Sequence, residues 1–487
     1  MNKSKYSFTP ETIQQLFGFE DAESESTERL KEYFLKKDTY DSMFADLPLR
    51  ILVGHKGTGK SALFRVLMAD EEDRGSLVVM IKPDDIAEIC LDQSNFLLRI
   101  REWKEGLRRI IIEKSLAQFG TTDESNWQSF AKKSLGIIEF LTSSSYKLKE
   151  YVDPTEAQKK CAEKYLENRR IVVFLDDLDR GWEGKKDDVT RISALLNAIR
   201  DLASENEGLR FKVALRSDVY YLARTSDEST DKIEGSVVWC KWTNHEILVM
   251  LIKRILTYNQ QNANYDTLLV SDQFHLSTYL DGVFTRKFEG LGIWSNTYTY
   301  KVLMSMIRKR PRDLVKLCAL AASHAYSSKS NIINTDHLRA SFDEYSQGRL
   351  QDTINEYRSE LPNVQDLLLE MKPTTKEKKA GKGFVYTTSE LKEKINGIMQ
   401  HHRFYLAGKQ ATDSSLLNFL YKINFITARK VVDNGEIQRK YFEENRYLTN
   451  TSVDFGYDWE VHPAFRWALQ PDDINGIFER LSIAKDE

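Results

Sequence analysis

The sequence is poor in cysteine and has no long apolar run. Its four cysteines, among 487 residues, are widely spaced and form no C-x-x-C pair, which excludes a disulfide framework and a zinc ribbon. We therefore expect small buried thiols in a reducing, intracellular protein. No stretch reaches the roughly 18–20 apolar residues that a membrane-spanning helix needs, and the first residues show no secretion signal. These absences predict a soluble, cytoplasmic protein without a membrane partner.

A strong excess of charge is also missing. Seventy basic and 73 acidic side chains give a net charge of −3, which excludes a protein that coats nucleic acid through overall basicity. The hydrophobic content of 41% is sufficient for folded cores. Because domains usually span roughly 100–200 residues, the length predicts two to four of them.

A glycine-rich turn follows the apolar run LRILV (49–53) and precedes a helical pattern, ALFRVLM. The turn, GHKGTGKS, matches G-x-x-x-x-G-K-[ST] at every fixed position. In such a loop the backbone N–H groups surround phosphate oxygens, the lysine reaches the β- and γ-phosphates, and the hydroxyl ligates Mg²⁺. We therefore predict ATP and Mg²⁺ as cofactors, with Lys60 in catalysis and Ser61 on the metal. The predicted nucleotide-binding residues are Gly54, His55, Lys56, Gly57, Thr58, Gly59, Lys60, Ser61 and Ala62.

An acidic pair ends the apolar run IVVFL (171–175). Asp176 stands where a carboxylate is needed to hold Mg²⁺ beside the loop, so we predict it as a metal ligand together with Ser61. Asp177 is the predicted catalytic base that orients or deprotonates the attacking water, with a supporting hydrogen-bonding role as the alternative. Asp179 and Arg180 are explained almost as well by a surface ion pair.

Together, GHKGTGKSAL and VVFLDDLDR resemble the motifs of the KAP and STAND P-loop ATPases, relatives of the AAA+ proteins. The segment KVALRSDVY resembles the family strand that carries a polar sensor, which would be Arg216 or Ser217. The segment KRPRDLVKLCALA resembles a helical-domain turn in which Arg312 would face the nucleotide, with helix capping by Pro311 as the alternative. The resemblance covers roughly residues 10–350 and implies catalytic roles for Arg216 and Arg312. The chain departs from it by carrying neither a transmembrane pair nor a long repeat array.

Apolar periodicity completes the predicted organisation. Strand-sized runs alternate with helical patterns up to residue 240, as in β-α-β units, and the pattern is helical throughout from about 242 to 345. We predict an α/β P-loop NTPase core with a parallel sheet, an α-helical domain and a C-terminal winged-helix-like domain with a hairpin at Asn434-Gly435. The predicted segments are 1–48, a lead-in of two short helices; 49–240, the core with a helical insertion at about 93–168; 241–371, the α-helical lid or sensor domain; 372–384, a basic linker; and 385–487, the winged-helix-like domain.

Local basic charge is concentrated near the predicted linker. Residues 372–403 carry eight Lys or Arg against three Glu, a charge of +5. Neighbouring aromatic residues could stack on bases, and these are Phe384, Tyr386, Phe404 and Tyr405. A solvated lysine-rich linker is the alternative, and winged helices also dock proteins, so the pattern leaves both kinds of partner open.

Three functions are compatible with this sequence. The first is an ATP-hydrolysing switch that controls a partner protein; no nuclease, protease or deaminase signature is present, so we expect a separately encoded effector. The resemblance associates such ATPases with bacterial antiviral defence, and a homo-oligomer is a further expectation. The second is an ATP-dependent DNA-binding protein of the origin-recognition type that uses the winged helix. The third, a scaffold that does not hydrolyse its nucleotide, is disfavoured by the presence of both Asp176 and Asp177.

Overall fold

The chain folds into two compact units in a computed structural model. One unit is Ser26–Cys240, and the other combines Met1–Glu25 with Lys241–Glu487. The structure describes residues 6–90, 95–117, 170–181, 185–226, 228–261, 264–380, 383–406, 408–432, 435–449, 455–479 and 481–486. Most of the insertion predicted at about 93–168 therefore lies outside the described residues, and its described part is helix α5 (Phe96–Ala117).

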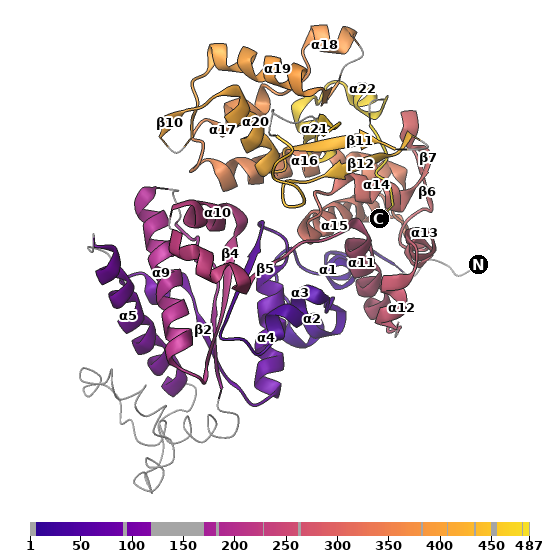
Figure 1. Cartoon of the computed structure of the whole chain (residues 1–487). Coiled ribbons are helices and arrows are strands. Elements are labelled where there is room, and N and C mark those ends of the chain that lie inside the picture. Colours follow the sequence, from indigo (N-terminus) through magenta and orange to yellow (C-terminus); the bar gives the residue numbers. More distant parts are fainter. Residues whose placement is uncertain are drawn as a thin grey trace, which may run out of the picture. The chain divides into compact units, whose positions relative to one another are not determined.

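A five-stranded parallel sheet forms the centre of the Ser26–Cys240 unit (Figure 1). The strand order is β2-β3-β4-β1-β5, so β4 lies between the strand that leads to the glycine-rich turn and the strand that ends at the acidic pair. The strands are β1 (Leu49–Gly54), β2 (Leu77–Ile81), β3 (Ile171–Leu175), β4 (Leu209–Arg216) and β5 (Val237–Trp239). Their nearly continuous apolar sequences follow from burial on both faces.

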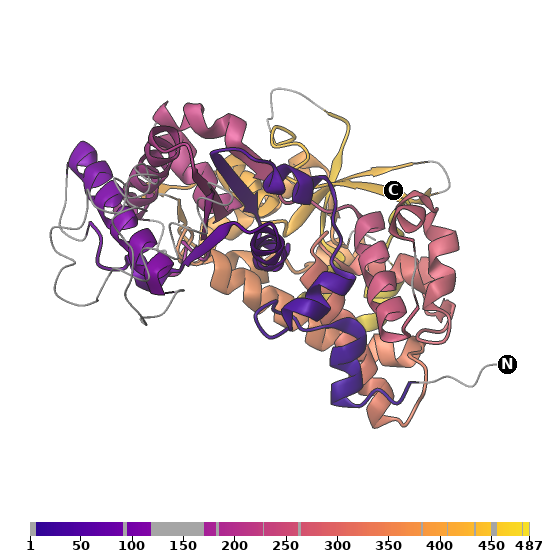
Figure 2. The same cartoon turned by 90° about the horizontal axis from the view of Figure 1, so that it is seen from below.

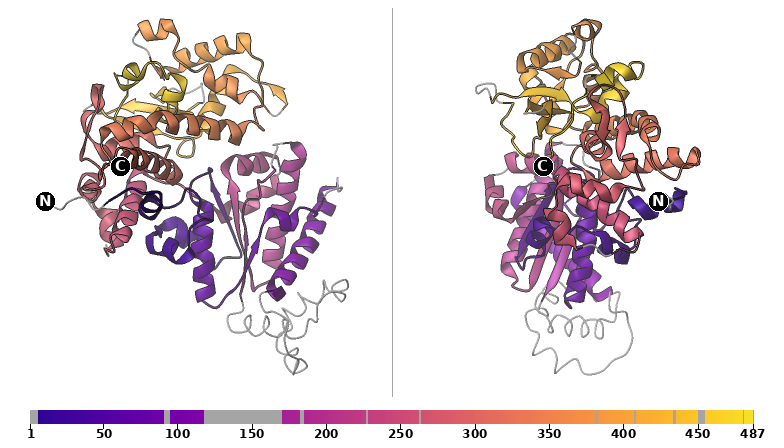
Figure 3. Two further views of the ribbon diagram at one scale, coloured as in Figure 1. Left: turned by 180° about the vertical axis from the view of Figure 1, so that it is seen from behind. Right: turned by 90° about the vertical axis from the view of Figure 1, so that its right-hand side faces the viewer.

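Helices cover both faces of this sheet. Successive residues of β1 point to opposite sides, so Ile51 and Val53 join one hydrophobic cluster while Leu52 joins the other. One cluster includes α5, α9 (Lys186–Glu205) and α10 (Ser217–Ser226); the other includes α2 (Thr27–Tyr33), α3 (Asp38–Phe44) and α4 (Lys60–Asp73). Figure 2 shows α5 beside α9, and the left view of Figure 3 shows the strands between α4 and α9. The predicted α/β core is therefore present.

Three helices, rather than the predicted two, precede β1. The first is α1 (Pro10–Phe17), which packs against helices of the Lys241–Glu487 part. A side-chain cap from Ser26 begins α2, and the extended backbone of Phe34 ends it before α3 starts. The prediction of a single second helix was wrong because this break carries neither proline nor glycine.

The second unit is mainly helical around α1 and α11 (Asn244–Tyr258). Its other main helices are α14 (Thr299–Met306), α15 (Pro311–Ser327) and α16 (Thr335–Tyr357), with the shorter α12 (Tyr265–Val270), α13 (Gln273–Ser277) and α17 (Val364–Leu369). The expectation of a wholly helical pattern from 242 to 345 is wrong, because β6 (Lys287–Glu289) and β7 (Ser295–Tyr298) form an antiparallel pair. Among the described residues, no helix combines the length and apolar character needed to cross a bilayer.

A four-stranded antiparallel sheet occupies the C-terminal part, in the order β12-β11-β13-β8. The predicted hairpin is present, with Val431 of β11 opposite Ile437 of β12 (Figure 1). The strands are β8 (Val385–Tyr386), β11 (Ile426–Val431), β12 (Ile437–Lys440) and β13 (Asp458–Val461), and the helices are α19 (Thr388–His401), α20 (Asp413–Lys422), α21 (Pro463–Leu469) and α22 (Ile474–Glu479). A short helix, α18 (Thr375–Lys379), lies within the predicted linker. The winged-helix assignment itself stays a prediction.

Three of the four aromatic residues predicted to stack on bases are buried. Phe384, Tyr386 and Phe404 are each no more than 2% exposed, whereas Tyr405 is 48% exposed. The prediction is wrong for the buried three, because their rings pack into the core of this part and present no face to a ligand.

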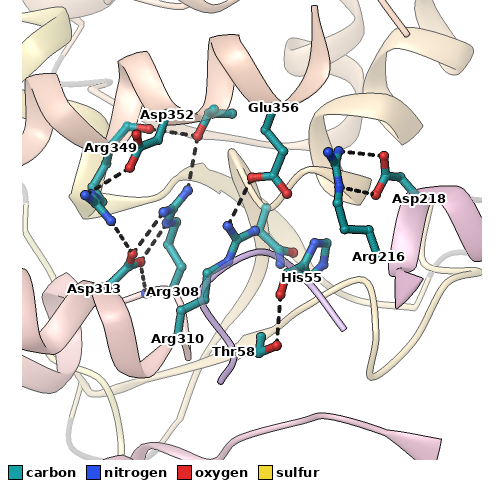
Figure 4. Close-up of polar contacts among 12 residues, drawn as sticks. His55, Thr58, Arg216, Asp218, Arg308, Arg310, Asp313, Arg349, Asp352 and Glu356 are labelled. Carbon is teal, nitrogen blue, oxygen red and sulfur yellow. Dashed lines mark hydrogen bonds and ion pairs between the residues drawn. The ribbon is translucent and has the colours of Figure 1, made fainter. Parts of the chain in front are cut away.

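A buried ion-pair network joins α15 and α16 of the second unit (Figure 4). Asp313 accepts hydrogen bonds from the guanidinium groups of Arg308 and Arg349, at 2.8 to 3.0 Å. Burial alone would raise the pKa of the Asp313 carboxyl, but the two neighbouring arginines hold it well below its usual range. A second buried carboxylate, Glu460, is held in the same manner by Arg439 and Arg466.

We predict that Asp313→Asn destabilises the protein by about 3–5 kcal/mol, because it leaves two buried guanidinium groups without their shared carboxylate. Asp352→Asn is the matched control: Asp352 also pairs with Arg349, at 3.0 Å, but its side chain is 50% exposed against 1% for Asp313. Its cost should be under about 1 kcal/mol. Urea unfolding followed by circular dichroism measures both, and equal costs would contradict this role for Asp313.

Lys212 is a buried lysine in β4, with 1% of its surface exposed. Its ammonium donates to the carbonyl oxygen of Ala45 at 2.9 Å. Burial lowers the pKa of Lys212 to about 8, against the opposing attraction of Glu71. Between this pKa and the ordinary lysine value near 10.5, the unfolded chain therefore binds more protons at this position than the folded chain does.

We therefore predict that the free energy of unfolding rises between pH 8 and pH 10.5 by on the order of 3 kcal/mol through Lys212, because protonation of the folded state is lost first. Lys212→Met should flatten this rise, whereas the exposed Lys82→Met should retain it. Urea denaturation at several pH values makes the comparison. Identical pH profiles for the wild type and Lys212→Met would show that Lys212 is not the titrating group.

Candidate functional site

The glycine-rich turn lies between β1 and α4 at the carboxyl end of the parallel sheet. Gly54 is the last residue of β1, residues 55–59 form the turn, and Lys60, Ser61 and Ala62 are the first three residues of α4. Gly57 and Gly59 have φ angles of 82° and 89°, a left-handed backbone that favours glycine. These glycines permit the chain to turn directly from the strand into the helix.

Close packing also requires glycine at position 54. A Cβ atom there would lie 2.8 Å from Thr58 Oγ1 and 2.9 Å from the Cβ atom of Cys240. The Thr58 hydroxyl in turn donates to the carbonyl oxygen of His55 at 2.8 Å (Figure 4). The beginning and the middle of the turn are thus held together by direct contact.

The start of α4 is left open to an anion. Its N-cap, Gly59, has no side chain that could accept from the first turn, and that turn contains no acidic residue. By contrast, α11 and α19 of the same chain begin with a capping Thr and a Glu three residues later. The positive end of the α4 dipole therefore has no counter-charge from its own first turn, which suits phosphate oxygens.

Lys60 is held within the turn. Its ammonium donates to the carbonyl oxygens of Gly54 at 2.9 Å and His55 at 3.1 Å. The cation is thus already bent back over the loop, and a phosphate would replace these carbonyl acceptors. The side chain of Lys56, in the same turn, is exposed.

Asp176 and Ser61 meet beside the turn. Asp176 follows the last residue of β3, is only 6% exposed, and accepts a hydrogen bond from the Ser61 hydroxyl. Burial raises the pKa of the Asp176 carboxyl, against the lowering effects of Ser61 and of the backbone N–H of Asp177. A buried carboxylate and a hydroxyl are hard oxygen donors, and a divalent cation would offset the desolvation of this charge. The donor set therefore fits Mg²⁺.

Asp177 points differently from its neighbour. Its backbone is left-handed, with φ 57°, its side chain is exposed, and its N–H donates to Asp176 Oδ1 at 2.9 Å. This strained backbone separates the two carboxylates, since one is buried at the sheet and the other faces solvent.

The end of β4 brings two further residues to this edge of the sheet. Arg216, paired in register with Gly54, forms a two-pronged ion pair with Asp218, at 2.7 and 3.1 Å, and contacts Asp179 at 3.3 Å (Figure 4). The buried Ser217 hydroxyl lies 3.1 Å from His55 Nδ1. Lys60, Ser61, Asp176 and Arg216 therefore belong to neighbouring strand ends of one unit.

Arg312 belongs to the other unit, in the first turn of α15. Its Nε donates to the carbonyl oxygen of Glu20 at 3.0 Å, and Lys316, one turn later, pairs with the Glu20 carboxylate. Arg308 and Arg310, which precede α15, are both buried. Arg308 forms an ion pair with Asp313, and Arg310 forms one with Glu356. The segment thus has a structural role within its own unit, while the sensor role of Arg312 stays a prediction.

Sequence reasoning missed two contacts at the site. The hydrogen bond between His55 and Ser217 joins the turn to the end of β4, 162 positions away in sequence. The ion pair between Arg216 and Asp218 had a local signal, because the two residues flank one strand end. Within the described ranges, His, Cys, Asp and Glu side chains form no group of three or more that could hold a metal ion.

Comparison with known proteins gives one family match and one curated relative. Residues 278–354, which include most of α16, match the family described as FunZ-associated C-terminal helical domain. The chain is 21% identical, over 529 aligned residues, to the 80.3 kDa protein attributed to transposon gamma-delta of Escherichia coli (strain K12). That alignment covers 96% of this chain and 70% of the relative.

Solved structures of similar fold include the Walker-type ATPase paby2304 of Pyrococcus abyssi, with 13% identity, a TM-score of 0.41, and coverage of 93% of this chain and 96% of that one. The Aeropyrum pernix ORC2 protein has 10% identity, a TM-score of 0.40, and coverage of 88% and 87%. The Aeropyrum pernix ORC1 protein in complex with DNA has 14% identity, a TM-score of 0.33, and coverage of 96% of both chains. At such scores the P-loop assignment rests on the turn, the strands and the sheet of this chain, and the KAP or STAND resemblance stays a prediction.

Proposed function

We propose that this chain is a Mg²⁺-dependent ATPase that acts as a molecular switch on a partner protein. One observation carries the proposal: the Ser61 hydroxyl of a complete phosphate-binding turn is hydrogen-bonded to a buried carboxylate at the end of β3. A mere strand-to-helix turn would gain nothing from a desolvated carboxylate at this place.

Phosphate binding begins with the turn and Lys60. The open N-terminus of α4 offers backbone N–H groups and a positive dipole to the phosphate oxygens. Lys60 exchanges the carbonyl oxygens of Gly54 and His55 for the β- and γ-phosphates, so the ammonium keeps hydrogen-bond acceptors throughout. Its charge then opposes the negative charge that develops during phosphoryl transfer.

Ser61 and Asp176 would hold the metal between them. Bound Mg²⁺ would neutralise phosphate charge and help to align the triphosphate. Asp177 stands next in sequence with its carboxylate exposed, so we assign it to orient, or to accept a proton from, the attacking water. Its left-handed backbone keeps that carboxylate away from the metal-binding one.

We propose that Arg216 adopts a different arrangement when nucleotide is bound. In this structure both of its carboxylate partners, Asp218 and Asp179, hold its guanidinium. A γ-phosphate would compete with these carboxylates for the guanidinium N–H groups, so we expect nucleotide binding to loosen the β4–α10 corner. We propose that this rearrangement reports the nucleotide state to the rest of the chain.

We predict that Lys60→Ala abolishes ATP turnover, because no other lysine of the turn reaches the phosphates. Lys82→Ala is the control: Lys82 is exposed in the same unit and is not among the predicted nucleotide-binding residues, so turnover should stay within about twofold. Asp177→Asn should keep ATP bound while slowing hydrolysis by about 100-fold or more. Phosphate release and equilibrium binding of labelled ATP measure these effects. Turnover in Lys60→Ala equal to that of the wild type and of Lys82→Ala would refute the ATPase.

The switch requires a partner, and we expect a separately encoded effector, in keeping with a role in bacterial antiviral defence. Asp177→Asn, which should trap the ATP state, is the bait for co-purification from the native host, with Lys60→Ala as the nucleotide-free control. We predict a protein recovered in near-stoichiometric amount with Asp177→Asn alone, and native mass measurement gives the composition of the complex. Recovery of the same proteins by both baits would argue against control by nucleotide.

The alternative is an ATP-dependent DNA-binding protein that uses the C-terminal part. Burial of Phe384, Tyr386 and Phe404 removes three of the four side chains predicted to stack on bases, while the winged helix on which this alternative depends stays a prediction. We therefore favour the switch.

A further inference from the structure

A small basic cavity lies in the second unit, beside the edge strand β12 and independent of the phosphate-binding turn. It is lined by the start of α11, by Lys309, by β12 and the residues that follow it up to Glu444, and by the C-terminal segment that pairs with β12. Figure 1 labels α11 and β12. The lining residues are Asn244, Lys309, Ile437, Gln438, Arg439, Lys440, Tyr441, Glu444, Ala484, Lys485 and Asp486.

Positive charge exceeds negative charge in this cavity. Four of its lining side chains are cationic and two are acidic, and both acids already have partners. Glu444 pairs with Lys309 at 2.9 Å and accepts from the Tyr441 N–H, while Asp486 accepts from the Tyr300 hydroxyl and lies 3.6 Å from Lys301. The acids therefore do not neutralise the remaining lysines.

Lys440 and Lys485 are those remaining cations. In the part of the chain that the structure describes, neither makes an ion pair within 4.0 Å. The guanidinium of Arg439 adds a third positive charge, since its partner Glu460 is shared with Arg466. Arg439 is 5% exposed at its side chain, and its NH2 nitrogen is buried without a hydrogen-bond partner in the described structure. Such an arrangement costs free energy unless an anion compensates it.

The volume of the cavity limits the size of its ligand. The cavity measures about 180 Å³, below the roughly 300–1,000 Å³ of sites that enclose a drug-sized ligand, so it suits a single small group. Lysine ammonium groups act as point charges that bind phosphate oxygens, so the excess of lysine favours a phosphate. The N-terminus of α11, where Asn244 lies, adds no attraction, because Thr243 caps it and Glu246 stands in its first turn.

We propose that this cavity binds a phosphate group, contributed either by a free phosphorylated ligand or by a nucleic-acid backbone. Lys485, which is exposed, and Lys440, which is partly exposed, supply the charge that attracts it, and the buried guanidinium of Arg439 adds positive charge nearby. The proposal is independent of ATP hydrolysis at the turn.

The test uses the full chain in a Lys60→Ala background, so that the phosphate-binding turn does not contribute. Inorganic phosphate and pyrophosphate are titrated by calorimetry, and a short fluorescent DNA duplex by anisotropy, both at low salt. The site variant is Lys440→Gln with Lys485→Gln. The control, Lys287→Gln with Lys329→Gln, removes two exposed lysines of the same unit that do not line the cavity.

We expect the site variant to lose affinity by about tenfold or more, and the control to change by less than about twofold. Lys440→Arg with Lys485→Arg should retain binding, and equal melting temperatures would verify folding. Loss with phosphate or pyrophosphate identifies a free ligand. Loss with the duplex alone, with a salt slope lowered by about one per lysine, identifies a nucleic-acid backbone. Absence of binding by every probe, or equal losses in the site variant and the control, would overturn the proposal.

Discussion

The desolvated carboxylate of Asp176 is the constraint on which the proposed nucleotide site depends. Asp176 follows a strand that is buried on both faces, and the Ser61 hydroxyl, one backbone N–H and the charge of Lys60 offset part of its lost hydration. A buried charge of this kind costs free energy when no cation is close to it, and a neighbouring cation offsets that cost. Three features hold the Asp176 carboxylate where a cation could bind it. These are the parallel sheet, the turn before α4 and the left-handed backbone of Asp177.

The buried carboxylates of the second unit differ from Asp176, because the protein itself compensates their charge. Asp313 and Glu460 are each enclosed by two guanidinium groups, so their charges are met permanently by the protein itself. These clusters fix how helices and strands pack in that unit. Buried carboxylates thus stabilise the packing of the second unit. In the Ser26–Cys240 unit the charge of Asp176 is only partly compensated, which leaves this carboxylate able to bind a metal ion.

The sequence alone predicted the parts of the fold whose signals are local. The turn at Gly54–Ser61, the apolar strands around it and the hairpin at residue 435 depend on neighbouring residues, and all three are present. The pair β6 and β7 was missed because strands of three or four residues with mostly exposed side chains carry little periodicity. Burial of Phe404, and the hydrogen bond between His55 and Ser217, arise from tertiary packing that no local pattern reports.

Contact between Gly54 and Cys240 has a mechanical consequence. Cys240 is the last residue of the Ser26–Cys240 unit, and its Sγ atom donates to the carbonyl oxygen of Thr58 at 3.4 Å, inside the turn. The chain therefore continues to Lys241 directly from a residue that contacts the turn. A displacement of Cys240 would act on the turn through this hydrogen bond and through the close packing against Gly54.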